Sequence, residues 1–256
     1  MQSNTKYTIQ IGKRTLVFES VSSTNELLWS KITNSEPLEE GTAILAKHQE
    51  SGKGQRGNSW QAEKGLNLTF SYLLYPNFLS VSNQFLLSAC TSIGIARFLE
   101  RYLDEVHIKW PNDLLIKGKK VCGILIESRI SKNNLSKAVI GIGLNTNQTE
   151  FPKELPNATS LRMALNKQEP FDNEKLYSEL CQELSSSFQL LIDNKHDIIL
   201  QQYNKRLFQI HEKRPYIINN SKVTAALQPV GIDGLASLKL ENKTLHLQPQ
   251  GFRYIF

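Results

Sequence analysis

The stretch SGKGQRGNSWQAEKGLNLTFSYLLY, residues 51–75, decides between two fold classes. Its glycines Gly52, Gly54 and Gly57 have the G-x-G-x-x-G spacing of a dinucleotide-binding turn. Such a turn must open a helix, because the helix N-terminus holds the pyrophosphate. Here alternating apolar residues from Leu66 to Leu74 follow, and their period of two predicts a strand. The stretch therefore argues against a Rossmann fold, and it also lacks the lysine of a Walker A loop.

Two cations, Lys53 and Arg56, lie among these glycines. A plain hairpin connection explains the glycines but not the cations, since flexible loops favour Ser, Asn and Asp. A loop between two strands can instead enclose an anion with its backbone N–H groups and its cations. We therefore expect residues 51–60 to form a mobile cover over an anionic ligand.

Composition limits the class of protein. The chain has 256 residues, of which 40% are hydrophobic, so one large domain, alone or with a small appendage, is expected. A formal charge of +6 suits anionic ligands but does not predict a nucleic-acid binder. Three scattered cysteines without a C-x-x-C pair predict buried thiols rather than disulfides or a zinc site. No signal-peptide pattern and no run of about 18 apolar residues occurs, so we expect a cytoplasmic location without membrane contact.

Apolar periodicity predicts the elements around the loop. Strands are expected over residues 7–18, 41–49, 66–75 and 137–147. Helices are expected over residues 83–103, 173–194 and 197–208. Ser23, with Glu26 three residues later, predicts a capping box at the start of a further helix, and Ser82 is expected to cap the helix from 83. Apolar runs on both sides of KGKK (117–120) predict a hairpin whose lysines form a solvated turn. Short strand patterns over 213–256 predict a small β-barrel.

Two further segments combine a charged or small residue with a constrained backbone. In KWPND (109–113), Lys109 precedes an aromatic residue and a proline turn, which can aim its charge at a phosphate or carboxylate. An ordinary surface lysine before a turn is the alternative. In GIGLN (141–145), Gly141 and Gly143 interrupt an apolar strand, which indicates either a ligand close to the backbone or tight packing under a helix.

Taken in order, these segments resemble the motifs of the biotin protein ligases. The family pattern has a capped STN, a strand ending in Gln, a GRGRxG loop with a tryptophan shortly after it, and then KWPND, GILxE and GxGxN. The corresponding segments here are STN (23–25), Gln49, GKGQRGNSW (52–60), KWPND (109–113), GILIE (123–127) and GIGLN (141–145). The resemblance covers roughly residues 16–256, and KWPND with GILIE at this spacing is its most specific part.

The resemblance implies an α+β fold. A mixed β-sheet with packed helices, like the core of class II synthetases, would form a catalytic domain of the biotin/lipoate ligase type at residues 1–209. A small SH3-like β-barrel would follow at residues 210–256. Bifunctional members of the family carry an N-terminal winged-helix DNA-binding domain. Since the motifs here begin almost at once, we expect the single-function type, with no DNA partner. The resemblance leaves a homodimer through an exposed sheet edge open.

The resemblance also implies an ATP-dependent ligase. The carboxylate of biotin would attack the α-phosphorus of ATP, with Mg²⁺ shielding the phosphates, to give biotinyl-5′-AMP and pyrophosphate. A lysine of a biotin carboxyl carrier protein domain would then accept the biotin and release AMP. Neither a nucleophilic side chain nor a dedicated protein metal site is required, because positioned cations and N–H groups would stabilise the developing charge.

Positions in the matching motifs assign the expected site. The expected catalytic residues are Lys109, Lys53 and Arg56. The expected biotin-binding residues are Ser23, Thr24, Asn25, Gln49, Lys53, Gly54, Gln55, Lys109, Gly123 and Gly141. The expected ATP-binding residues are Arg56, Trp60, Asn112 and Asn145, where Trp60 would either shape the wall or anchor the core. Gly123, Gly141 and Gly143 would admit ligand against the strands.

The loop departs from the family pattern at two positions. Lys53 keeps a positive charge but lacks the planar fork of the usual arginine, and Gln55 has no charge. The neighbouring Arg56 is expected to compensate. Two other functions remain open: a lipoate-type protein ligase, which shares the fold and the adenylation step, and a non-catalytic biotin-binding module, which only Gln55 supports.

Overall fold

A mixed seven-stranded sheet forms the centre of the protein. The computed structural model describes residues 7–34, 37–249 and 251–255. The strand order is β1-β2-β3-β7-β6-β5-β4; β1 and β2 are parallel, and the other neighbours are antiparallel. The strands are β1 (Thr15–Phe18), β2 (Ala43–Ala46), β3 (Leu68–Leu74), β4 (Val106–Lys109), β5 (Asp113–Ile116), β6 (Lys119–Ser131) and β7 (Asn134–Leu144). The expected mixed sheet with packed helices is thus present.

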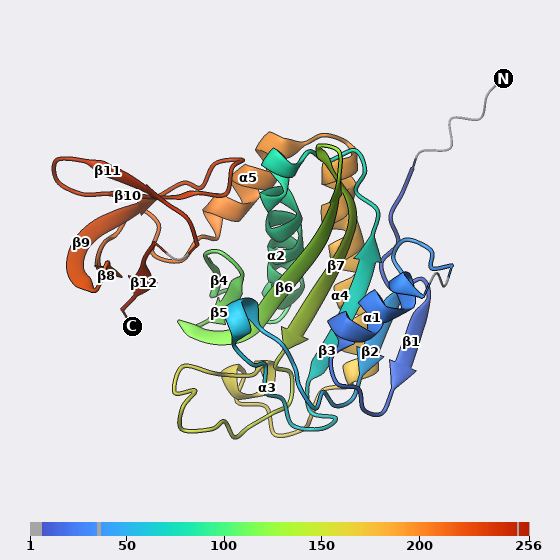
Figure 1. The fold of residues 1–256 in the computed structure, drawn as a ribbon. Helices are drawn as coiled ribbons and strands as arrows, with labels where there is room; N and C mark the ends of the chain where they lie inside the picture. Colours follow the sequence, from blue (N-terminus) through green and yellow to red (C-terminus); the bar gives the residue numbers. More distant parts are fainter. Residues whose placement is uncertain (1–6, 35–36, 250, 256) are drawn as a thin grey trace.

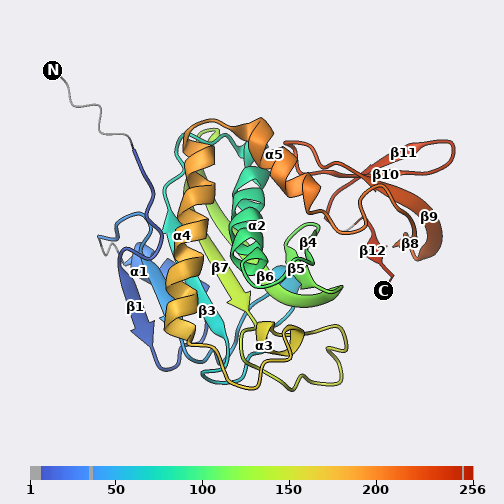
Figure 2. The same cartoon turned by 180° about the vertical axis from the view of Figure 1, so that it is seen from behind.

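Helices cover the two faces of this sheet unequally (Figures 1 and 2). The long helices α2 and α4 lie side by side on one face, and the shorter α1 lies on the other. The helices are α1 (Thr24–Thr33), α2 (Phe85–Glu100), α3 (Leu161–Ala164), α4 (Asn173–Ile192) and α5 (His196–Lys205). The glycine loop joins β2 to β3 and contains only the 3₁₀ turn η1 (Gln55–Gly57), so no helix follows it as a Rossmann turn would need.

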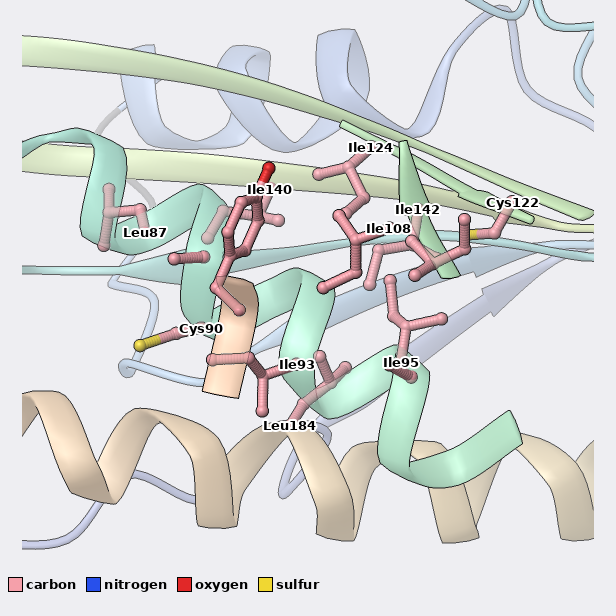
Figure 3. Close-up of a cluster of buried hydrophobic side chains, with 14 of the residues drawn as sticks. Leu87, Cys90, Ile93, Ile95, Ile108, Cys122, Ile124, Ile140, Ile142 and Leu184 are labelled. Carbon is pink, nitrogen blue, oxygen red and sulfur yellow. The ribbon is translucent and has the colours of Figure 1, made fainter. Parts of the chain in front are cut away.

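The face under α2 and α4 is apolar. Alternate residues of β3 from Leu68 to Leu74 lie in this core, as their period of two predicts. Figure 3 shows α2 between the sheet and α4, with Ile93 next to Leu184 of α4 and Ile95 on the side of Ile142 of β7. Removal of this apolar surface from water is the main stabilising contribution to the fold.

The three cysteines belong to the same core. Cys90, Cys122 and Cys181 are free and buried, as predicted. Burial raises the pKa of all three thiols, for Cys181 to about 12, so each stays protonated at neutral pH. These thiols pack as small apolar side chains.

The opposite face of the same strands is divided: an apolar cluster that includes Leu73 and Val139 packs against α1, and small and polar residues lie next to it. Ser71 of β3 pairs with Gly141 of β7, and Thr69 pairs with Gly143 in the next row. Gly143 pairs in turn with Gly123 of β6. Because alternate residues of a strand point to opposite faces, the strands that build the core also present this row of small side chains.

The start of α1 differs from the sequence prediction. Ser23 occupies the N-cap position of α1, but its side chain makes no capping hydrogen bond. Gln49, which follows β2, supplies the capping hydrogen bond instead, because its Oε1 accepts from Thr24 N at 2.8 Å. The predicted capping box is therefore wrong: a residue distant in sequence satisfies the helix end.

Other boundaries also shift. Gln84, not Ser82, is the N-cap residue of α2, because Ser82 lies in the 3₁₀ turn η2 (Val81–Asn83). Of the strand expected over 7–18, only the end forms a strand, β1. The hairpin at KGKK is confirmed, with Lys117 and Gly118 at positive φ between β5 and β6, but Lys120 lies within β6 and pairs with Asp113 rather than forming part of a solvated turn.

A second sheet follows near the C-terminus (Figure 1). Its strand order is β11-β10-β9-β8-β12, with β8 (Lys213–Ile218), β9 (Ser221–Gln228), β10 (Ala236–Lys239), β11 (Thr244–Leu247) and β12 (Arg253–Tyr254). Within the described residues its end strands do not pair, so the sheet is open and the predicted barrel is not confirmed. Trp110 joins the two sheets: its Nε1 donates to Gly234 O at 3.1 Å, and its ring stacks on Phe252.

Candidate active site

A cavity of about 470 Å³ opens on the polar face of the large sheet. Its walls come from the start of α1, the glycine loop, the KWPND turn, β6, β7 and the C-terminal segment around β12. The volume lies in the range of small-molecule sites. The row of small residues on this face leaves the required space above the strands.

The end of the cavity beside α1 is a network of uncharged polar groups. Gln49 Oε1 accepts from both Thr24 N and Thr24 Oγ1, at 2.8 and 3.0 Å. Ser71 Oγ lies 2.7 Å from Thr24 Oγ1 and 2.6 Å from Asn25 Oδ1. Ser23, Thr24, Asn25 and Ser71 are all buried. This end can recognise a neutral ligand that both donates and accepts hydrogen bonds.

The strand glycines give two large side chains room to lie on the sheet. A β-carbon at Gly141 would overlap the Asn25 amide, and one at Gly143 would overlap the Trp60 indole. Gly123 also lies against Trp60, at 3.1 Å from a β-carbon position to Cζ3. The glycines thus make room for these two wall residues, and all three glycines also line the cavity. Trp60 lines the cavity and packs on β6 and β7 outside the two apolar clusters, which favours the role of a wall residue over that of a core anchor.

Two lysines converge on one carboxylate at the other end. Lys120 Nζ lies 2.7 Å from Asp113 Oδ1, and Lys109 Nζ lies 3.4 Å from Asp113 Oδ2. Lys120 also lies over the Trp60 ring, with 5.7 Å from Nζ to the centroid. Asn112 fixes the KWPND turn to β6, because its Nδ2 donates to Ile124 O at 2.7 Å. The two ammonium groups are therefore held in place beside each other.

The glycine loop closes on itself beside this cluster. Gly54 N donates to Asn58 O at 2.7 Å, and Trp60 N donates to Gly52 O at 2.8 Å. Lys53 forms an ion pair with Glu26 of α1, which raises the pKa of Lys53 and lowers that of Glu26. Both side chains are largely exposed, so the pair is a weak tether that an incoming anion can replace.

Arg56 is exposed in the same loop and adopts the left-handed region, with φ of 61°. That conformation is unfavourable for residues other than glycine. Arg56 also lines the cavity. Its guanidinium is the second loop cation at the cavity, after that of Lys53.

The C-terminal segment completes the cationic end. Phe252, Arg253 and Tyr254 line the cavity, and Lys109 Nζ lies 5.5 Å from the centre of the Tyr254 ring. Five cations and one carboxylate line the cavity among the described residues: Lys53, Arg56, Lys109, Lys120, Arg253 and Asp113. This excess of positive charge predicts an anionic ligand.

The structure brings together nearly all of the residues expected from the motifs. The exception is Asn145, which is buried, does not line the cavity and donates from Nδ2 to Thr159 O at 3.0 Å. Lys120, Asp113 and Arg253 line the cavity but were not among the expected site residues. Asp113 lies within KWPND and Lys120 three residues before GILIE, so proximity to those motifs was the available signal. Nothing in the local sequence pointed to Arg253.

Two absences concern the described part of the chain. No helix there is long and apolar enough to cross a membrane. No group of three or more His, Cys, Asp or Glu side chains there is arranged to hold a metal ion.

The sequence model of the biotin/lipoate A/B protein ligase family matches residues 17–145, which include every motif segment of the cavity. The chain belongs to this family. A curated relative, the bifunctional ligase/repressor BirA of Bacillus subtilis, is 34% identical over 159 residues, or 60% of this chain and 48% of the relative. The biotin--[acetyl-CoA-carboxylase] ligase of Mycobacterium tuberculosis is 27% identical over 175 residues, or 66% of this chain and 62% of the relative. The chain thus spans about half the length of the first of these family members.

Solved structures of the family share the whole arrangement. The biotin protein ligase from Aquifex aeolicus in complex with biotin and ATP superposes with a TM-score of 0.77 at 25% sequence identity. The match covers 94% of this chain and 97% of that one. It therefore extends across both sheets.

Proposed function

We propose that this chain is an ATP-dependent ligase that adenylates biotin and transfers it to a lysine of a biotin carboxyl carrier protein domain. Residues 1–209 would form the catalytic domain. Residues 210–256 would form a second domain, related to the SH3-like fold, that closes the cationic end of the site. The family membership and the similarity to a biotin and ATP complex support this proposal.

The observation that carries the proposal is a single cavity with two chemically different ends. Its uncharged end, with Thr24, Asn25 and Gln49, suits a ureido ring, which both donates and accepts hydrogen bonds. Its cationic end, with Lys109 and Lys120, suits a carboxylate next to a phosphate. Biotin carries a ureido ring at one end and a carboxylate at the other, and ATP would supply the phosphate.

In the first half-reaction, a carboxylate oxygen of biotin attacks the α-phosphorus of ATP, and the bond from that phosphorus to the bridging oxygen of the β-phosphate breaks. Negative charge grows on the phosphoryl oxygens and on the departing pyrophosphate. Lys109 and Lys120 would stabilise this charge from fixed positions, since Asp113 orients both before the ligands arrive. Lys53, Gln55 and Arg56 would cover the reacting groups from the loop.

In the second half-reaction, the neutral amine of the carrier lysine attacks the carbonyl carbon of the mixed anhydride. AMP leaves with the bonding electrons, and the amine loses a proton. Water would compete in this step by hydrolysing the anhydride. The glycine loop and the segment around Phe252 and Arg253 flank the cavity and would exclude water.

Mg²⁺ enters the proposal with ATP, as part of the substrate. Asp113 is the single carboxylate among the described residues of the cavity, and two lysines already pair with it. One engaged carboxylate does not suit a resident Mg²⁺, which prefers several oxygen ligands and binds readily to phosphates.

The test is incubation of the purified chain with biotin, MgATP and an apo carrier domain, followed by mass spectrometry of the carrier. We expect the carrier to gain one biotinyl group and pyrophosphate release to require biotin. Transfer of lipoate in place of biotin would overturn the substrate assignment. Biotin binding without transfer would identify a non-catalytic binding module instead.

A further inference from the structure

The Asn25 amide at the uncharged end of the cavity is held by contacts from three strands. Asn25 Nδ2 donates to Glu127 Oε2 of β6 at 2.7 Å. Asn25 Oδ1 accepts from Ser71 Oγ of β3 at 2.6 Å. Gly141 of β7 lies directly beneath, where any β-carbon would overlap the amide. Asn25 is buried, so these neighbours, rather than water, determine how its amide is turned.

Glu127 is the neighbour that decides the orientation. A carboxylate only accepts hydrogen bonds, so the amide must turn its NH₂ group toward Glu127. The reverse orientation would place Asn25 Oδ1 against the carboxylate and Nδ2 against Ser71. The other polar neighbour, the Ser71 hydroxyl, is compatible with either orientation of the amide, because a hydroxyl can both donate and accept a hydrogen bond. The directions in which the Asn25 amide presents its donor and its acceptor therefore depend on the carboxylate of Glu127.

Glu127 also belongs to a wider contact between β6 and α1. Alternate residues of β6 meet every fourth residue of α1: Glu127 contacts Asn25, and Arg129 contacts Trp29 and Thr33. The Arg129 guanidinium lies 4.8 Å from the centre of the Trp29 ring, and its Nη2 donates to Thr33 Oγ1 at 3.2 Å. The Arg129 contacts lie along α1 away from the cavity. The strand thus offers a charged contact at the ligand wall and a second one outside it.

We propose that Glu127 is a positioning residue for biotin. Glu127 is not among the described residues that line the cavity, so it would act without touching the ligand. It turns the Asn25 amide so that the second Nδ2 hydrogen and the second Oδ1 lone pair are presented in a fixed pattern to the ureido group. This role rests on the proposed function, since it assumes that the uncharged end receives the biotin ring.

The test measures the biotin dissociation constant by calorimetry, together with the melting temperature, in the full chain. Glu127→Gln keeps the size of the side chain but removes the charge that fixes the amide. We expect biotin binding about tenfold weaker, because a charge-assisted hydrogen bond is replaced by a neutral one of either orientation. The Michaelis constant for ATP should stay within about twofold of wild type, since the ATP end is unchanged.

Arg129→Ala is the matched control. It removes the other contact between β6 and α1 and leaves the amide untouched. We expect a lower melting temperature with an unchanged biotin dissociation constant. Weakening of biotin binding by Arg129→Ala as large as that by Glu127→Gln would mean that Glu127 acts only by holding α1, and it would overturn the positioning role.

Exchanging the amide of Asn25 and the carboxylate of Glu127 separates the effect of holding α1 on β6 from the effect of which group faces the ligand. In the double variant Asn25→Asp with Glu127→Gln, the hydrogen bond between β6 and α1 is retained with its donor and acceptor exchanged. The melting temperature should recover toward wild type, while biotin binding should stay weak because a carboxylate now faces the ligand. Recovery of binding in this variant, or wild-type affinity in Glu127→Gln, would overturn the proposal. Failure of the wild-type chain to bind biotin at all would instead overturn the proposed function, and the positioning role with it.

Discussion

The two faces of the large sheet use the same strands for different purposes. Phe70 and Ser71 are neighbours in β3, and both side chains are fully buried. Phe70 lies among apolar side chains under α2 and α4, whereas Ser71 bonds to Thr24 and Asn25 at the cavity. Side chains that are equally buried thus serve two different purposes in this protein. On the face under α2 and α4, buried side chains supply most of the stability; around Ser71 on the other face, they hold ligand-facing groups in place, with the strand glycines making room for Asn25 and Trp60.

The largest expected effect is on the apolar face. Phe70→Ala should lower the free energy of unfolding by about 3–5 kcal/mol, because it removes a large buried side chain and leaves a cavity. The matched variant Ser71→Ala, one residue away, should cost about 1–3 kcal/mol at most, through the hydrogen bonds it loses, while it weakens biotin binding. Urea denaturation checks both. Equal destabilisation by the two variants would contradict the division between the faces.

On the cavity face, Lys109→Ala should abolish most adenylate formation and leave the melting temperature nearly unchanged. Loss of one positioned charge-stabilising group lowers turnover by about 10²–10³-fold. Lys120→Ala should act in the same direction, because both ammonium groups face Asp113. The neighbouring Lys119, exposed and outside the cavity, supplies the control Lys119→Ala, which should be silent. Biotin-dependent pyrophosphate release at near wild-type rate in Lys109→Ala would refute its assigned role.

A smaller effect on stability is expected at Gly143, where packing on the sheet also positions a side chain of the cavity wall. Gly143→Ala should displace the Trp60 indole from the sheet, at a cost of about 1–3 kcal/mol for overpacking. The displaced ring should also reduce biotin-dependent turnover. Adding Trp60→Leu, which removes the indole, should restore much of the stability without restoring activity. Wild-type stability and turnover in Gly143→Ala would show that the indole does not depend on this glycine.

The smallest expected effect is in the exposed loop. Arg56→Ala should slow adenylate formation by about twofold to fivefold, in keeping with one solvent-screened charge. Gln55→Ala, which removes no charge, should have less effect, and Arg56→Lys should retain most of the activity. Single-turnover measurements of adenylate formation compare the three variants. A milder effect of Arg56→Ala than of Gln55→Ala would argue against compensation by Arg56.

Local sequence signals predicted much of this arrangement. The alternation from Leu66 to Leu74 gave β3 and its apolar face, and the absence of a helix after the glycine loop excluded a Rossmann turn. The motif positions led to most of the cavity wall. Local signals failed at the start of α1, where the capping-box spacing of Ser23 and Glu26 is matched but unused. Gln49, which comes close only when β2 pairs with β1 and β3, takes over that function.

The sequence by itself determined the strand and helix periods, the apolar core and the order of the site motifs, because these depend on neighbouring residues along the chain. Only the tertiary structure decided which side chains complete the cavity. Strict alternation from Gly123 would turn residue 121 toward the cavity and Lys120 toward the core. The register of β5 against β6 shifts between Leu114 and Leu115, and this irregularity brings Lys120 to Asp113 instead. Arg253 likewise reaches the cavity only because the second sheet packs against Trp110, a contact between segments far apart in the chain.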